Sequence, residues 1–126
     1  APAPHDLHPD HEATGQIARR AQFSSGLAKL WPELGAAYRP KMLLAYPLHH
    51  EIDAKFCVDI SDVAERKLAA LKCFETQLGN AAHLARLDPF DRTKARDAFY
   101  GAQVGVRAAE PFDHEGPLLL DPSIWL

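Results

Sequence analysis

The sequence predicts a mixed α/β fold, and three observations lead to that prediction. First, 126 residues, of which 47% are apolar and 25% charged, are enough for one domain with a modest core. Second, apolar residues recur at helical spacing in three separate segments. Third, two short apolar runs between the first and second of these segments have the composition of strands.

The first predicted helix runs from Pro9 to about Leu30. Proline is favoured at the first helical position, where its missing N–H costs nothing, so His8 is the expected N-cap. Pro32 and Gly35 are expected to end the element, and residues 1–7 to form an extended lead-in. Residues spaced four and three apart form one stripe that we expect to pack in the core: Ile17, Ala21, Ser24, Ala28 and Trp31.

Two strands are expected next. Lys41–Tyr46 is an apolar run between two prolines, which indicates a buried strand, and Phe56–Val58 is a shorter strand-like run. The polar loop between them carries His49 and His50. Loops that follow a strand often carry ligand-contacting groups in α/β proteins, although such a loop can also be merely solvated.

The second predicted helix begins after Ser61 or Asp62, either of which can cap it, and ends near Leu78. Gly79-Asn80 is a plausible C-terminal stop. Its expected buried stripe consists of Ala64, Leu68, Leu71, Phe74 and Leu78. Its expected solvated residues are Glu65, Arg66, Lys67 and Lys72.

The third predicted helix begins at Asp88-Pro89 and ends near Gly105. One side carries Ala95, Ala98, Phe99 and Ala102, and the other carries Arg92, Lys94, Arg96 and Asp97. The remainder is expected to be loop, with Leu118–Leu120 as one last candidate strand.

Composition excludes several classes of protein. The net charge is −3, which gives no sign of a surface for nucleic acid or for an anionic membrane. No apolar run approaches the ~20 residues of a membrane span. Cys57 and Cys73 lie in apolar patterns and are expected to be reduced core thiols, which is consistent with a cytoplasmic protein.

Residues 5–11 contain three histidines and two aspartates, all able to bind a metal or move a proton. With His8 as N-cap, Asp10 and His11 lie in the first helical turn, where the helix dipole favours a carboxylate. Imidazole is a good zinc ligand, and a neighbouring carboxylate can orient it. The alternatives are a solvated, frayed segment and an unrelated metal site built from His5, His8 and His11, against which Pro9 argues.

The pattern Asp-x-His-Pro-Asp-His from Asp6 to His11, followed by a helix, resembles the second signature of the PIG-L (LmbE-like) deacetylases. These are zinc-dependent enzymes that remove acetyl groups from N-acetylglucosamine conjugates. The likeness continues through Val58–Ser61, Glu65–Gln77 and Ala95–Phe112, the last of which is similar to bacillithiol-type deacetylases. The resemblance implies a Rossmann-like three-layer α/β sandwich with a mostly parallel sheet, of which residues 1–126 would be the C-terminal portion of one domain.

The resemblance also implies roles for individual residues. His11 matches the metal-ligating histidine, His8 the general acid that also steadies the oxyanion, and Asp10 the carboxylate that orients such an imidazole. His49 and His50 are expected to contact the substrate, with at least one of them pointing toward His11. The implied cofactor is Zn²⁺, which would polarise the acetamide carbonyl and lower the pKa of its bound water.

One departure from the family pattern shapes the expected partners. The family's other signature, Ala-His-Pro-Asp-Asp/Glu, supplies another zinc histidine, a zinc aspartate and the general base, and it does not occur in this sequence. We therefore expect the chain to act as part of a larger enzyme, with the N-terminal half of the domain as partner and a homo-oligomer as a further candidate. The alternative is a non-catalytic remnant that serves as a binding or assembly module.

Overall fold

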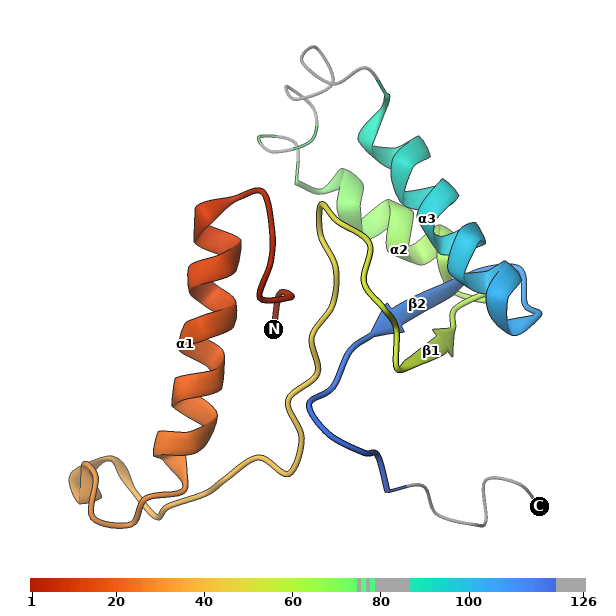
Figure 1. Ribbon diagram of the computed structural model, residues 1–126. Helices are drawn as coiled ribbons and strands as arrows, with labels where there is room; N and C mark the ends of the chain where they lie inside the picture. Colours follow the sequence, from red (N-terminus) through yellow and green to blue (C-terminus); the bar gives the residue numbers. More distant parts are fainter. Residues whose placement is uncertain (75, 77, 79–86, 120–126) are drawn as a thin grey trace. The chain divides into compact units, whose positions relative to one another are not determined.

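The computed structural model describes residues 1–74, 76, 78 and 87–119. Its elements are α1 (Pro9–Ser25), the 3-10 helix η1 (Pro32–Leu34), β1 (Phe56–Asp59), α2 (Ala64–Lys72), α3 (Pro89–Val104) and β2 (Ala109–Phe112), as Figure 1 shows. They belong to two compact units, one of Ala1–Lys55 with the described residues after Pro111, and one within Phe56–Pro111. The mixed α/β class is confirmed, and none of the described helices is long and apolar enough to cross a membrane.

Helix α1 begins as the sequence predicts. His8 has extended dihedral angles (φ −93°, ψ 121°), and its Nδ1 accepts a hydrogen bond from the Asp10 N–H at 3.1 Å. The helix ends at Ser25, earlier than expected, because Gly26 follows and the Ser25 hydroxyl donates to the Gln22 carbonyl.

The predicted core stripe of α1 is wrong. No residue of α1 is buried, and Ile17 is 65% exposed. The residues that are partly covered are small or polar, and of the predicted stripe only Ser24 is among them: His11, Glu12, Gly15, Ala18, Gln22 and Ser24. The reason lies at Gly15, where an added Cβ would stand 2.8 Å from the Pro2 carbonyl oxygen. A residue without a side chain lets the extended lead-in approach the helix there, so the helix packs by that face.

The strand predicted over Lys41–Tyr46 is also wrong, because only its end is paired. Tyr46 forms a parallel bridge with Pro2, and Ala45 forms an antiparallel bridge with Asp113. A strand exists only where a neighbouring strand supplies hydrogen-bond partners. In the described residues, these two bridges therefore replace a full ladder.

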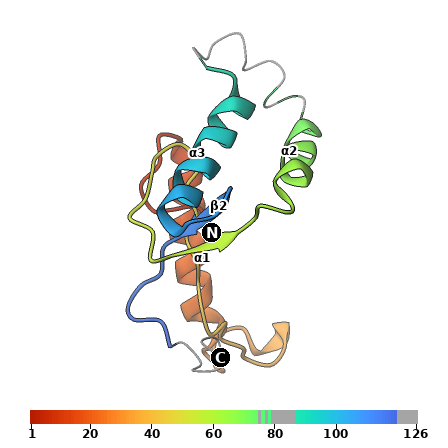
Figure 2. The ribbon, with the colours of Figure 1, turned by 90° about the vertical axis from the view of Figure 1, so that its right-hand side faces the viewer.

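The second unit contains a sheet of two antiparallel strands, β1 and β2, and α3 packs against β1. Figures 1 and 2 both show the C-terminal end of α3 beside these strands. The strand β1 was predicted, whereas β2 was expected to be loop because it contains Pro111. Proline is tolerated at the edge of a sheet. In the described part of the chain, the sheet is thus antiparallel rather than mostly parallel.

Helix α2 lacks the predicted cap. Its N-cap is Val63, which makes no capping hydrogen bond through its side chain. The Ser61 hydroxyl is used elsewhere, since it interacts with the Asp59 carboxylate and accepts from the Ala108 N–H at 3.3 Å. Of the expected stripe only Leu68 is buried, and Phe74 is exposed. The predicted stop at Gly79-Asn80 lies outside the described residues, as does Leu120 of the last candidate strand, while Leu118 and Leu119 are not in a strand.

Helix α3 begins and ends as predicted but turns the opposite face inward. Asp88 caps it by accepting from the Phe90 N–H at 2.7 Å, and Gly105 ends it in the left-handed region at φ 77°. The expected buried side is exposed, with Phe99 51% exposed and the three alanines open as well. The buried residues are Asp97, Tyr100 and Gly101. Gly101 decides this, because an added Cβ there would stand 2.9 Å from the Ala108 backbone, so close contact with the strand needs glycine.

Burial of Asp97 is possible because Lys67, expected to be solvated, neutralises it. Lys67 Nζ donates to both Asp97 carboxylate oxygens at 2.8 Å and pairs with Glu110 at 2.7 Å. These residues come from α3, α2 and β2, so one cluster joins three elements. The Lys67–Asp97 ion pair also explains why the apolar pattern of α3 predicted the wrong buried face. A carboxylate can be buried when a paired charge neutralises it.

Asp97→Ala is expected to lower the free energy of unfolding by about 3 kcal/mol, because it leaves Lys67 largely buried with only Glu110 as partner. Denaturant titration of the chain measures this. The matched control is Asp91→Ala on the same helix, which removes an exposed pair with Lys94 and should cost less than about 0.5 kcal/mol. Equal losses in the two variants would show that the cluster does not stabilise the unit.

The two cysteines are free, as predicted, but only partly in the core. Cys57 on β1 is half-buried, and burial raises the pKa of its thiol. Cys73 is exposed at the end of α2, so the prediction of a core thiol is wrong at that position.

Candidate metal centre

Asp6 lies at the centre of the histidine-rich segment, and its side chain is only 2% exposed. Its Oδ1 is 2.9 Å from His11 Nδ1 and 2.6 Å from His49 Nδ1. The same oxygen accepts from the His8 N–H at 2.9 Å, and Oδ2 accepts from the His49 N–H at 3.1 Å. A single carboxylate therefore joins the lead-in, the start of α1 and the loop after Tyr46.

Three imidazole rings lie in a row beside this carboxylate. The ring centroids of His8 and His11 are 4.8 Å apart, and those of His11 and His49 are 5.1 Å apart, with both pairs stacked. The His11 and His49 side chains are 32% and 36% exposed, so solvent reaches the rings while the carboxylate behind them is covered.

The Asp6 carboxyl is held ionised by its neighbours. Burial by itself raises the pKa of this carboxyl. The hydrogen bonds from the His8 and His49 backbones and from the two imidazoles together lower it by more, so the pKa lies well below its usual range. At neutral pH the group therefore carries a full negative charge and can only accept hydrogen bonds.

The donor set suits a zinc ion. Asp6, His11 and His49 each offer a ligand atom, and these atoms lie within 4.8 Å of one another. Imidazole nitrogen and carboxylate oxygen are the usual non-thiolate ligands of Zn²⁺. The resemblance assigned one ligand, and the structure brings two further candidates to it.

Of the other predicted site residues, only His8 lies beside the Asp6 group. His8 lies next to His11 in the row of rings, whereas the Asp10 side chain is 87% exposed and its Oδ2 is 3.9 Å from His8 Nδ1. His50 is exposed, and His5 is exposed and lies outside the group of three.

Sequence reasoning gave the central role to Asp10 and overlooked Asp6 as the shared partner. The only available signal was the aspartate two residues before the N-cap histidine. The carboxylate that contacts two imidazoles is thus Asp6, while Asp10 contributes its backbone N–H to His8.

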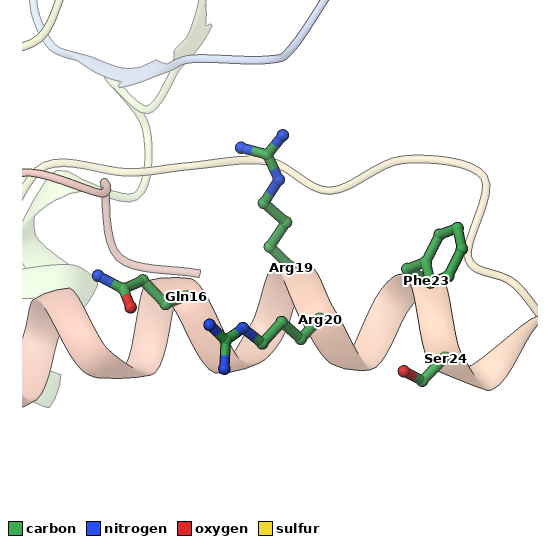
Figure 3. Close-up of a pocket in the computed structure, with 5 residues that line it drawn as sticks. All are labelled: Gln16, Arg19, Arg20, Phe23 and Ser24. Atoms are coloured by element: carbon green, nitrogen blue, oxygen red, sulfur yellow. The ribbon is translucent and has the colours of Figure 1, made fainter.

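A hollow along the second half of α1 is a separate feature. Figure 3 shows its lining, which consists of Gln16, Arg19, Arg20, Phe23 and Ser24. All five come from one helix, and Arg19 is engaged in an ion pair with Glu115. None of them belongs to the Asp6 group, so this hollow adds nothing to the candidate metal centre.

Comparison with known proteins supports the family resemblance. The chain is 32% identical over 108 residues to the diacetylchitobiose deacetylase of Thermococcus kodakarensis, a match that covers 85% of this chain and 39% of that protein. It also matches the crystal structure of the conserved protein TT1542 from Thermus thermophilus, with a TM-score of 0.83, 31% identity and coverage of 97% of this chain and 52% of that one. These matches confirm the resemblance of this chain to part of a PIG-L (LmbE-like) deacetylase.

A third comparison agrees with this family assignment. The N,N'-diacetylchitobiose deacetylase of Pyrococcus horikoshii, solved with an inhibitor, matches with a TM-score of 0.69 and 28% identity over 90% of this chain and 43% of that one. The chain thus spans about half or less of the length of these PIG-L relatives. No family model matches the sequence.

The fold itself is not confined to deacetylases. The 4-carboxy-2-hydroxymuconate hydratase GalB of Pseudomonas putida matches with a TM-score of 0.70 at 20% identity, over 96% of this chain and 52% of that one. This likeness concerns the fold alone, so the chemistry of this chain has to be argued from its side chains.

Proposed function

We propose that this chain is the C-terminal portion of a zinc-dependent enzyme that hydrolyses the N-acetyl group of an N-acetylglucosamine conjugate. The observation that carries the proposal is the Asp6–His11–His49 group at the start of α1. Two relatives named as deacetylases of diacetylchitobiose, which is built from N-acetylglucosamine, support the substrate class.

His11 would hold the zinc ion, with the neighbouring His49 ring as a second candidate ligand from this chain. When bound, zinc supplies a Lewis acid for the amide carbonyl and a water of lowered pKa. The chain itself would hold the ligands in place before the substrate binds. The buried Asp6 carboxylate does this through its hydrogen bonds to the His11 and His49 rings.

His8 would act as the general acid. In that role the ring would be an imidazolium, which keeps the proton on Nδ1, the atom 3.9 Å from Asp10 Oδ2, and gives up the proton on Nε2. That proton is on the side of the ring away from the backbone, in a half-exposed residue next to His11. The departing amine of an amide needs such a proton, so His8 is placed to give it.

A second function is favoured by one observation. The chain covers about half or less of its relatives and lacks the signature that would supply the general base. A remnant that binds or assembles without hydrolysing would have the same properties, and it would have no need for stoichiometric zinc.

Metal removal from an intact enzyme that contains this segment separates the two functions. We expect one zinc per chain, release of acetate from an N-acetylglucosamine conjugate, loss of that release after chelation, and recovery when zinc is added back. The control is the same enzyme with His5→Ala, which leaves the Asp6 group intact and should behave as the unaltered protein. Acetate release that survives chelation would contradict the proposal, and absence of both zinc and hydrolysis would favour the remnant.

A further inference from the structure

The Asp6 carboxylate has more hydrogen-bond partners than any role in a helix cap or turn requires. It accepts from two backbone N–H groups, those of His8 and His49, and from the rings of His11 and His49. The farthest of these partners, His49, lies 43 positions from Asp6 in the sequence. The carboxylate is thus the shared anchor of the motif and of the loop that follows Tyr46.

The chemistry of an ionised carboxylate fixes the state of both rings. A carboxylate without a proton can only accept, so an imidazole nitrogen that bonds to it must be the donor. His11 and His49 therefore both carry a proton on Nδ1. A neutral ring with that proton has its lone pair on Nε2, which for His11 is the atom left to bind a metal.

Distances and burial indicate that Asp6 supports ligands rather than serving as one. Ligands of a tetrahedral zinc ion with bonds of about 2.0–2.2 Å stand about 3.3 Å from one another. The separations of Asp6 Oδ1 from the two Nδ1 atoms, 2.9 Å and 2.6 Å, are shorter and typical of charge-assisted hydrogen bonds. The carboxylate is also covered, whereas the rings are partly open.

We propose that Asp6 is a positioning residue that holds His11 and His49 in the Nδ1–H tautomer, directs His11 Nε2 to the metal and ties the His49 loop to the motif. The family resemblance gives Asp10 the task of orienting the His8 ring, so Asp6 serves a different pair of imidazoles. The assignment of the ring tautomers does not depend on the proposed deacetylase activity. The statement that His11 Nε2 binds the metal rests on the zinc site of the proposed function.

The test is an NMR measurement of the ring tautomers in metal-free chain 1–126 at mildly alkaline pH. We expect the Nδ1–H form for both His11 and His49 in the unaltered chain. In Asp6→Ala the rings should shift to the Nε2–H form that unconstrained histidine favours. Asp10→Ala is the matched control, because it removes an exposed carboxylate from the same segment and should change neither ring.

Zinc affinity provides a second readout. Asp6→Ala should weaken zinc binding by about 10–100-fold, as loss of a supporting partner does, whereas Asp10→Ala should leave it nearly unchanged. An Nε2–H form of His11 or His49 in the unaltered chain would overturn the proposal even if Asp6→Ala failed to fold. Tautomers and affinity that are the same with and without Asp6 would overturn it as well. Absence of deacetylase activity with the expected tautomers would count against the proposed function alone.

Discussion

Replacing His8 by asparagine is expected to lower the deacetylation rate of an intact enzyme that contains this segment by about 10²–10⁴-fold while leaving zinc bound. The ring lies beside His11 but is not among the three groups that could hold the ion. As an imidazolium the ring would deliver the Nε2 proton and become neutral, with the Nδ1 proton retained. Loss of that proton should affect turnover and not metal content.

His11→Ala provides the contrast, because it should release zinc as well as abolish turnover. Metal analysis and steady-state kinetics on the two variants measure both effects. Equal loss of zinc in the two variants would contradict the role given to His8.

The choice of asparagine controls for helix capping. His8 is the N-cap of α1, and a cap replaced by alanine costs about 1 kcal/mol of stability. Asparagine keeps an acceptor for the Asp10 N–H, whereas His8→Ala removes it. If the rate losses of the two variants agree while their free energies of unfolding differ, the rate effect belongs to the lost proton and not to the helix.

Residues 1–126 by themselves are expected to bind zinc but to show no deacetylase turnover. The His11 and His49 rings of the described chain already lie together beside Asp6, so we expect zinc to bind without a further segment. The family resemblance places the general base on the signature that this sequence lacks, so a bound water would have no group to take its proton. The expected loss is therefore the whole of the activity, while zinc binding remains.

The measurement is acetate release from an N-acetylglucosamine conjugate by chain 1–126 with zinc added, followed by a repeat with the other half of the domain supplied as a second polypeptide. Turnover should appear only in the second case. Light scattering should show self-association of the chain alone, because the apolar side chains of Ile17 on α1 and Phe99 on α3 are exposed. Turnover from a monodisperse monomer, abolished by a chelator, would show that another acid acts as the base.

Local sequence determined where α1 and α3 begin and where α3 ends. The pairs His8-Pro9 and Asp88-Pro89 predicted both helix starts, and Gly105 predicted the end of α3. These features depend on dihedral preferences and on hydrogen bonds to residues two or four positions away, which the chain carries in its own neighbourhood. The strand β1 and the family motif at residues 6–11 were readable for the same reason, because each is a contiguous pattern.

Only the tertiary structure decided which faces are covered and which carboxylate serves the site. The apolar pattern of α3 predicted a buried Phe99, yet Asp97 is buried, because Lys67 from another helix neutralises it. Likewise Asp6 and His49 meet across 43 positions, a contact that no spacing along the chain encodes. Burial and long-range hydrogen bonds depend on partners brought together by folding. The sequence therefore determined the starts of α1 and α3, the end of α3 and the motif, and the fold determined the geometry that makes the motif a candidate metal centre.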